Sequence, residues 1–308
     1  MKIVFMGTAE FAVPTLELLL EKEYNIVGVV TATDKWGGRG NKKLLQSAVK
    51  KFAVEKGLKV LQPKNLKAAS FQEELKALEA DLQVVVAFRM LPEAVWNMPP
   101  MGTMNIHGSL LPKYRGAAPI HWAVINGETE TGVSSFLLKH EIDTGDVLFQ
   151  AKTPIEEEET TGEVYERLMH LGARLALKSV QTIETGNFKC TPQETDKVTH
   201  APKIYHEDCK IDFDQTTAQV HNFIRGMSPS PTAWTTVDGQ KLKVFRSKKE
   251  QTSHNHTVGS IHTDGKRELK IATQDGYVHL LEVQLTKRKK MDVKSFLNGY
   301  KIDSNQVE

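Results

Sequence analysis

Residues 1–31, MKIVFMGTAEFAVPTLELLLEKEYNIVGVVT, decide the predicted fold of this chain. The apolar runs at 2–6 and 26–31 have the length and the β-branched content of buried strands, and the stretch 15–23 between them has the period of a helix. Two strands joined by such a crossover helix lie parallel in one sheet. The beginning of the chain therefore predicts an α/β fold.

The same alternation continues through the first half of the sequence. Further strands are expected at 59–61, 82–87 and 103–106, and further helices at 44–56 and 71–79. Ser70 and Glu73 have the spacing of a capping box at the start of the later helix. These elements predict a Rossmann-like parallel sheet with helices on both faces.

Two more strands, 132–138 and 147–151, follow without a helix between them and are expected to add a hairpin to the sheet. A long helix comes next, and Thr160 and Glu163 have the spacing of its capping box. Its apolar residues recur on one face, which indicates a side that packs into the core. They are Val164, Leu168, Leu171 and Leu175.

The last hundred residues have a different pattern. A helix is expected at 216–225, with Thr216 and Gln219 as its capping box. Short β-branched stretches then alternate with Asp-Gly pairs, a strong hairpin signal, at 238–239, 264–265 and 275–276. This pattern predicts a small OB-like β-barrel. The expected domains are 1–189, a linker at 190–206 and a C-terminal domain at 207–308.

The composition is that of a water-soluble globular protein of two domains, with 308 residues, 40% apolar and 25% charged. The longest apolar run, 84–88, is far shorter than the ~20 residues of a membrane span, and the start has no signal peptide or transit segment. Cys190 and Cys209 lack a metal-type spacing. We expect a cytoplasmic protein without membrane segment or metal and, because no exposed apolar stripe stands out, a monomer.

Positive charge is concentrated near the end of the chain. Residues 241–290 contain 12 Lys and Arg against 5 Asp and Glu, an excess of +7 in a chain with a net charge of +2. This excess favours a polyanionic partner, although a solvated basic surface would have the same composition.

Polar residues gather at the end of the strand predicted at 103–106. Asn105 and His107 lie two residues apart, so their side chains point to the same side, and Asp143 lies in the later hairpin turn. Together they could polarise a carbonyl, stabilise its oxyanion and move a proton, or simply cap turns. A nicotinamide cofactor is not expected, because Gly7 lacks the further glycines of a dinucleotide fingerprint.

The motif NIHGSLLPKYRGAAPI at 105–120, followed by DTGD at 143–146, resembles the formyltransferases that use 10-formyltetrahydrofolate. The similarity covers nearly the whole chain, from FMGTAEFA at 5–12 to FLNG at 296–299, and is closest to the members that act on tRNA. The resemblance implies catalytic roles for Asn105, His107 and Asp143. It also implies a folate pocket formed by Ser109, Leu110, Leu111, Pro112, Phe88, Arg89, Met90 and Leu91.

One part of the implied folate pocket departs from the family pattern. Phe88 and Arg89 stand where Tyr-Gly is commoner. Met90 and Leu91 could contact the pterin ring, or they could be core residues of a helix.

The glycine-rich basic loop 34–43 corresponds to a family loop that closes on the acceptor end of tRNA, although a solvated surface loop would have a similar composition. The residues implied to bind tRNA are Arg39, Lys42, Lys43, Lys287, Arg288 and Lys289. The implied reaction moves the formyl group of 10-formyltetrahydrofolate to the α-amine of methionine on initiator tRNA. Formylation of a small amine or nucleotide, and RNA binding without catalysis, remain alternatives.

Overall fold

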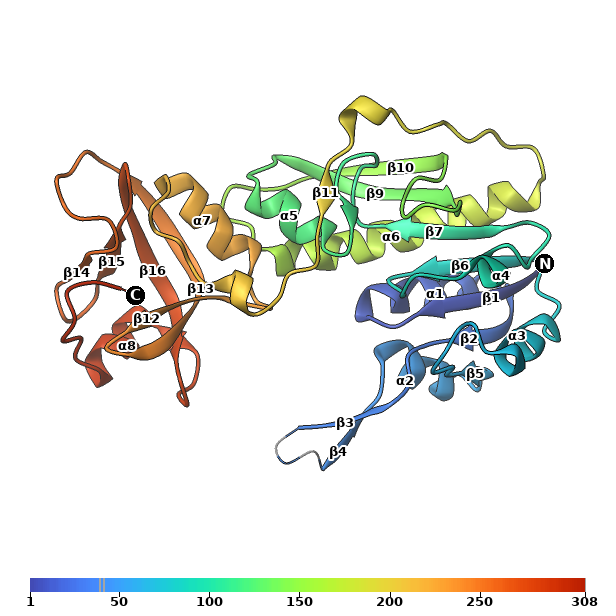
Figure 1. Ribbon diagram of the computed structural model, residues 1–308, viewed down its shortest axis with the longest axis horizontal. Coiled ribbons are helices and arrows are strands. Elements are labelled where there is room, and N and C mark those ends of the chain that lie inside the picture. The colour runs from blue at the N-terminus through green and yellow to red at the C-terminus, as the bar shows by residue number, and fades with distance from the viewer. Residues whose placement is uncertain (39, 41, 308) are drawn as a thin grey trace. The chain divides into compact units, whose positions relative to one another are not determined.

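The computed structural model describes residues 1–38, 40 and 42–307, and the chain divides into two compact units (Figure 1). The first unit consists of Met1–Gly116, Gly132–Thr153 and Tyr165–His200. The second consists of Ala117–Thr131, Pro154–Val164 and the chain from Ala201 onwards. Two short segments that precede the C-terminal part in sequence therefore fold with it.

The first unit contains a seven-stranded sheet in the order β10-β9-β7-β6-β1-β2-β5. Its strands are β1 (Lys2–Gly7), β2 (Asn25–Val30), β5 (Val60–Leu61), β6 (Leu82–Val86), β7 (Thr103–His107), β9 (Glu130–Leu137) and β10 (Val147–Pro154). Five neighbouring strands of this sheet, β7, β6, β1, β2 and β5, are parallel, whereas β9 is antiparallel to β7. The predicted Rossmann-like sheet is confirmed.

The apolar runs of the sequence form the central strands, whose two faces are both covered and therefore require apolar side chains. Val4, Phe5 and Val84 have no exposed surface, as expected for buried parallel strands. The strand register pairs Gly7 with Val86, and Val86 with Ile106. The carboxyl ends of β1, β6 and β7 therefore meet at one edge, where open α/β sheets bind ligands.

The helices of the first unit are α1 (Val13–Glu21), α2 (Ala48–Glu55), α3 (Ala69–Lys76), α4 (Glu93–Trp96) and most of α6 (Thr161–Glu184). The helix predicted at 44–56 is wrong at its start, because Leu44 and Leu45 lie in β4 (Lys43–Leu45), which pairs with β3 (Lys35–Gly37). Helix α2 begins only where the Ser47 hydroxyl accepts a hydrogen bond from the backbone N–H of Lys50, at 3.0 Å.

Of the predicted capping boxes, that of α3 is wrong and that of α6 is confirmed. Helix α3 begins one residue before Ser70, and its N-cap, Ala68, makes no side-chain hydrogen bond. At the start of α6, the Glu163 carboxylate accepts hydrogen bonds from the backbone N–H and the hydroxyl of Thr160, at 2.8 and 2.6 Å. The apolar stripe of α6 is core, since Val164 and Leu168 are fully buried.

The second unit contains an antiparallel sheet in the order β12-β13-β16-β15-β14, with β17 paired to β16. Its elements are α5 (Pro119–Ile125), α7 (Thr217–Gly226), β12 (Ala233–Val237), β13 (Gln240–Gln251), β14 (Ile261–Thr263), β15 (Leu269–Ala272), β16 (Gly276–Leu285), β17 (Met291–Asp292) and α8 (Val293–Gly299). Asp238 and Gly239 have φ values of 49° and 68° and form the turn between β12 and β13, as predicted.

The Thr216–Gln219 capping box of α7 is also present. The curled antiparallel sheet confirms the β-rich C-terminal part of the predicted fold. Among the described residues, no helix is both long enough and apolar enough to cross a membrane.

Glu163 makes stability depend on pH in the acid range. Burial alone would raise the pKa of Glu163, but the Thr160 hydrogen bonds and an ion pair with Arg246 (2.8 Å) outweigh it and hold the pKa at about 2, below the usual 4.5. This contribution is complete above pH 4.5 and is lost as the pH falls towards 2. We expect Glu163→Gln to weaken the dependence of unfolding free energy on pH across this window in denaturant titrations. The exposed neighbour Glu166, as Glu166→Gln, is the control.

Candidate active site

Two of the three predicted catalytic residues, Asn105 and His107, lie at the carboxyl end of β7. Asn105 and His107 alternate with buried Ile106, and the His107 side chain is itself buried, with 6% exposure. Asn105 is half-buried, and within the described chain its side-chain amide has no hydrogen-bond partner. That amide is therefore available as a donor for a ligand bound at the sheet edge.

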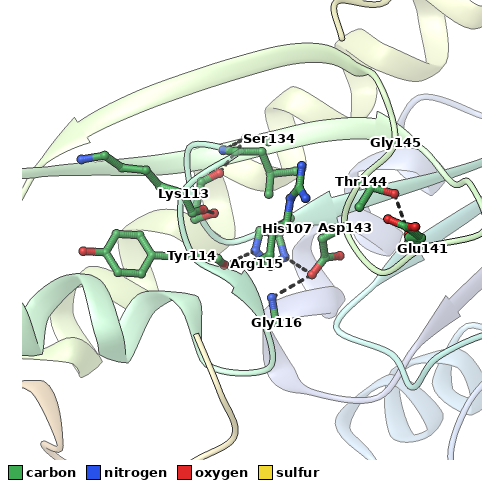
Figure 2. Close-up of polar contacts among 12 residues, drawn as sticks. His107, Lys113, Tyr114, Arg115, Gly116, Ser134, Glu141, Asp143, Thr144 and Gly145 are labelled. Atoms are coloured by element: carbon green, nitrogen blue, oxygen red, sulfur yellow. Dashed lines mark hydrogen bonds and ion pairs between the residues drawn. The ribbon is translucent and has the colours of Figure 1, made fainter. Parts of the chain in front are cut away.

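The ring of His107 has a fixed orientation (Figure 2). Its Nε2 lies 2.8 Å from the carbonyl oxygen of Tyr114. Because a carbonyl oxygen can only accept, Nε2 carries a hydrogen and donates it. The nitrogen left to exchange a proton is Nδ1, which lies 3.7 Å from Oδ2 of Asp143.

Asp143 projects from the turn between β9 and β10. Its side chain is 11% exposed, and Oδ2 also accepts a hydrogen bond from the backbone N–H of Gly116 at 2.9 Å. Its φ of 54° lies in the left-handed region. Nearby Gly145 has no room for a side chain, because a Cβ would lie 1.9 Å from the Leu137 carbonyl oxygen. The tight turn thus directs the Asp143 carboxylate at the imidazole.

The segment 109–112, implied to contact folate, is held by two side chains that sequence reasoning missed. The hydroxyl of Ser134 accepts the Leu111 N–H at 3.0 Å and donates to the Ser109 carbonyl at 2.7 Å. The amide of Gln150 donates to the Leu111 carbonyl at 2.8 Å and to the Ser134 hydroxyl at 2.9 Å. The only sequence hint of this role is that two polar residues occur within strands.

Within this segment, Ser109 and Leu111 are buried, whereas Leu110 and Pro112 are partly exposed. The Ser109 hydroxyl donates to the Lys113 carbonyl at 2.6 Å. Leu110 and Pro112 give the segment a partly exposed apolar surface. The Leu111–Pro112 peptide bond is cis.

The predicted pocket residues 88–91, which follow β6, differ in how far they are buried. Leu91 is buried in the core with Val95, as one of the two alternatives predicted, but it lies in a loop and not in a helix. Met90 is 73% exposed. Phe88 is partly buried, and the exposed Arg89 donates hydrogen bonds to the carbonyls of Pro63 and Lys64. Phe88 and Met90 thus keep surface available to a ligand, whereas Leu91 belongs to the core.

The predicted tRNA-binding residues belong to two different units. Lys42 and Lys43 are exposed at the β3–β4 hairpin of the first unit, and Arg39 lies outside the described residues. In the second unit, Lys287 and Lys289 are exposed between β16 and β17. Arg288 donates to the Gly299 carbonyl at 3.1 Å. The structure therefore groups His107 with Asp143 but leaves the basic residues in two sets.

The one cluster among the described residues with metal-ligand geometry contains Glu250, Glu268 and His279 in the second unit. Lys270 lies 3.0 Å from the Glu250 carboxylate, and His279 is paired with both glutamates. The Lys270 ammonium lies within 4.0 Å of both carboxylates, so this cluster is better described as an ion-pair network than as a metal site.

Comparisons with known proteins identify the family of this chain. A family model described as "Formyl transferase" matches residues 1–180, and one described as "Formyl transferase, C-terminal domain" matches 203–301. A protein of Parabacteroides distasonis named methionyl-tRNA formyltransferase is 50% identical over 98% of this chain and 96% of its own length. One of the same name from Flavobacterium johnsoniae is 46% identical over 97% and 96%.

A solved structure with a similar fold is the N-formyltransferase of Helicobacter canadensis in complex with folinic acid and dTDP-3-aminofucose. It has a TM-score of 0.68 and 21% identity, over 94% of this chain and 100% of that one. HypX of Aquifex aeolicus in complex with tetrahydrofolic acid has a TM-score of 0.64 and 22% identity, over 98% and 48%. The family models cover most of the chain, and the relatives are similar along its whole length. The chain belongs to the formyl transferase family.

Proposed function

We propose that this protein transfers the formyl group of 10-formyltetrahydrofolate to the α-amino group of methionine carried by initiator tRNA. The observation that carries the proposal is the grouping of His107 and Asp143 beside Asn105, in a chain half identical to a relative named methionyl-tRNA formyltransferase. The roles predicted for the site residues are part of this proposal.

The proposed reaction is a direct transfer. The neutral amine attacks the formyl carbon, and a new C–N bond forms while negative charge develops on the formyl oxygen. The donors proposed for that oxygen are the side-chain amide of Asn105, which has no partner among the described residues, and Nδ1 of His107 when it carries a proton. Loss of one such donor typically costs ~3 kcal/mol. As the bond from carbon to folate N10 breaks, N10 gains a proton and the former amine loses one. Asp143 supports this exchange at Nδ1.

The residues fit a folate substrate at the same edge of the sheet. A pterin ring needs a flat, mostly apolar surface with a few fixed polar groups. Leu110 and Pro112 offer partly exposed apolar side chains on a backbone held by Ser134 and Gln150. Two structures of similar fold, solved with folinic acid and with tetrahydrofolic acid, support a folate-type substrate.

The acceptor is inferred from charge and similarity. The +7 excess of residues 241–290 and the exposed lysines of the β3–β4 hairpin suit a polyanion better than a small amine. A nucleotide-sugar acceptor is the alternative suggested by the Helicobacter canadensis enzyme, whose 21% identity supports a shared fold alone.

The proposal is tested by formylation of initiator and elongator methionyl-tRNA side by side, with free methionine and an amino sugar nucleotide as small acceptors. We expect formyl transfer to initiator tRNA and little transfer to the small acceptors. Efficient formylation of a small amine would assign the chain to a different branch of the family. Binding of tRNA without any transfer would leave a non-catalytic RNA-binding protein.

The affinity for tRNA is expected to fall with salt, by roughly 0.7–0.9 log units per log unit of salt for each phosphate neutralised. We expect the double substitution Lys287→Gln and Lys289→Gln to reduce the steepness of this salt dependence by an amount that corresponds to the loss of up to about two phosphate contacts. Lys301→Gln is the control, because Lys301 is 89% exposed and paired with Asp303 at 3.5 Å. A salt-independent affinity in the parent protein, or equal slopes in the double variant and the control, would contradict this basic surface.

A further inference from the structure

The segment that leaves α6 returns along the candidate active site before it enters the second unit. Thr191 and Val147 exchange two backbone hydrogen bonds of 2.8 Å, so the segment is fixed beside the start of β10. The sequence predicted a linker at 190–206. Up to His200, however, this segment belongs to the compact first unit.

Gln193 uses both ends of its side-chain amide in this segment. Its Oε1 accepts hydrogen bonds from Nε and Nη2 of Arg115 at 3.1 and 2.7 Å. Its Nε2 donates to the backbone carbonyls of Asp143 and Gly145 at 2.8 and 2.7 Å. The partly buried side chain of Gln193 therefore joins two parts of the site. One is the catalytic turn, the turn between β9 and β10 that contains Asp143, and the other is β8 (Arg115–Gly116), which follows the segment 109–112.

Thr199 binds the backbone next to the Tyr114 carbonyl, which is the group that orients the His107 imidazole. Its hydroxyl accepts the backbone N–H of Tyr114 at 2.8 Å, and its carbonyl accepts the N–H of Arg115 at 2.9 Å. The carbonyl of Tyr114 is the group that fixes Nε2 of His107. Residues 191–199 thus hold the acceptor of His107 at one end and the turn of Asp143 at the other.

We propose that Gln193 is a positioning residue for formyl transfer, and that residues 191–199 form a strap that sets the distance between His107 and Asp143. This inference rests on the proposed function. The left-handed backbone of Asp143 needs support from its surroundings, because L-residues other than glycine rarely adopt it. The 3.7 Å separation of Nδ1 and Oδ2 is longer than a hydrogen bond, so the pairing depends on where the turn is held.

Two substitutions separate the functions of the Gln193 amide. Gln193→Ala removes its contacts with both Arg115 and the catalytic turn. Gln193→Glu retains an acceptor for Arg115 but has no N–H to donate to the carbonyls of Asp143 and Gly145. If the strap positions Asp143, both variants lose activity despite the Arg115 contact that the second retains.

The matched control is Gln274→Ala in the second unit. The Gln274 amide also ties a loop, donating to the carbonyl and the carboxylate of Asp214 at 3.1 Å. It therefore reports the effect of removing a loop-binding glutamine outside the candidate active site.

The experiment measures single-turnover formylation of methionyl-tRNA, KM for both substrates, thermal stability and the pH dependence of the rate. We expect both Gln193 variants to lower the transfer rate by roughly 10- to 100-fold, with KM within threefold of the parent. We also expect the pH dependence of the rate to change shape, because Nδ1 of His107 would no longer face a fixed carboxylate. The control should retain the parent rate and profile.

A transfer rate for Gln193→Glu equal to that of the parent would overturn the proposal, as would a loss of thermal stability with the rate and pH profile unchanged. If Gln193→Ala does not fold, Gln193→Glu alone decides between these outcomes. Formylation by the parent protein tests the proposed function separately. A parent that formylates methionyl-tRNA while Gln193 proves dispensable would refute only the strap.

Discussion

His107→Gln is expected to slow formyl transfer by about three orders of magnitude, within the range that general acid–base catalysis supplies together with an oxyanion donor. A glutamine amide can still donate a hydrogen bond towards the Tyr114 carbonyl, which His107 Nε2 contacts at 2.8 Å. It cannot exchange a proton at the position of Nδ1. The substitution therefore removes the chemistry and retains much of the local structure. The measurement is the single-turnover rate with methionyl-tRNA and saturating 10-formyltetrahydrofolate.

His121→Gln is the matched control, because His121 also contacts a backbone carbonyl, that of Ser230 at 3.0 Å, but lies in the second unit on α5. We expect this variant to keep the parent rate. If His107→Gln stays within threefold of the parent while its fold is intact, another group moves the proton and the role proposed for His107 is wrong.

The parallel sheet could be predicted from the sequence because its strands are buried on both faces. The runs at 2–6 and 82–87 contain no charged residue beyond Lys2, and both became central strands. The Asp-Gly turn at 238–239 was equally predictable, because this pair tolerates positive φ at both positions.

The β3–β4 hairpin was not predictable by the same reasoning. Leu44 and Leu45 precede a helical pattern and were assigned to it, but their side chains are 43% and 47% exposed in a two-stranded hairpin. Apolar periodicity indicates an element only where the apolar side chains are buried, and here they are not. The capping box predicted from Ser70 is wrong for another reason, because helix α3 begins one residue before Ser70.

The candidate site was only partly accessible from the sequence. The residues Asn105, His107 and Asp143 followed from a motif, whereas their supports are largely backbone groups, such as the Tyr114 carbonyl and the Gly116 N–H. Every residue except proline has both groups, so no pattern of side chains marks the ones that are used. Gln193 reaches the site from 50 residues beyond Asp143 in the chain, and only the fold brings them together.

Asp143→Asn is expected to lower the transfer rate by roughly 10²-fold or more, with little change in tRNA affinity. Asparagine has nearly the same size and can still accept the Gly116 N–H at 2.9 Å, so the turn should remain folded. It carries no charge, however, and cannot stabilise positive charge that develops on the His107 ring during the transfer, 3.7 Å away. The measurement is again the single-turnover rate, together with binding of methionyl-tRNA.

Asp146→Asn provides the control for Asp143→Asn within the same turn. Asp146 pairs with Lys139 at 2.8 Å, and within the described part of the chain it forms no hydrogen bond or ion pair with His107. Its loss removes one negative charge near the site without touching the imidazole, so we expect a rate close to that of the parent. A comparable fall in both variants would mean that the turn contributes a general electrostatic field. A rate for Asp143→Asn within threefold of the parent would remove Asp143 from the mechanism and leave Asn105 and His107 as the groups that act on the formyl carbon.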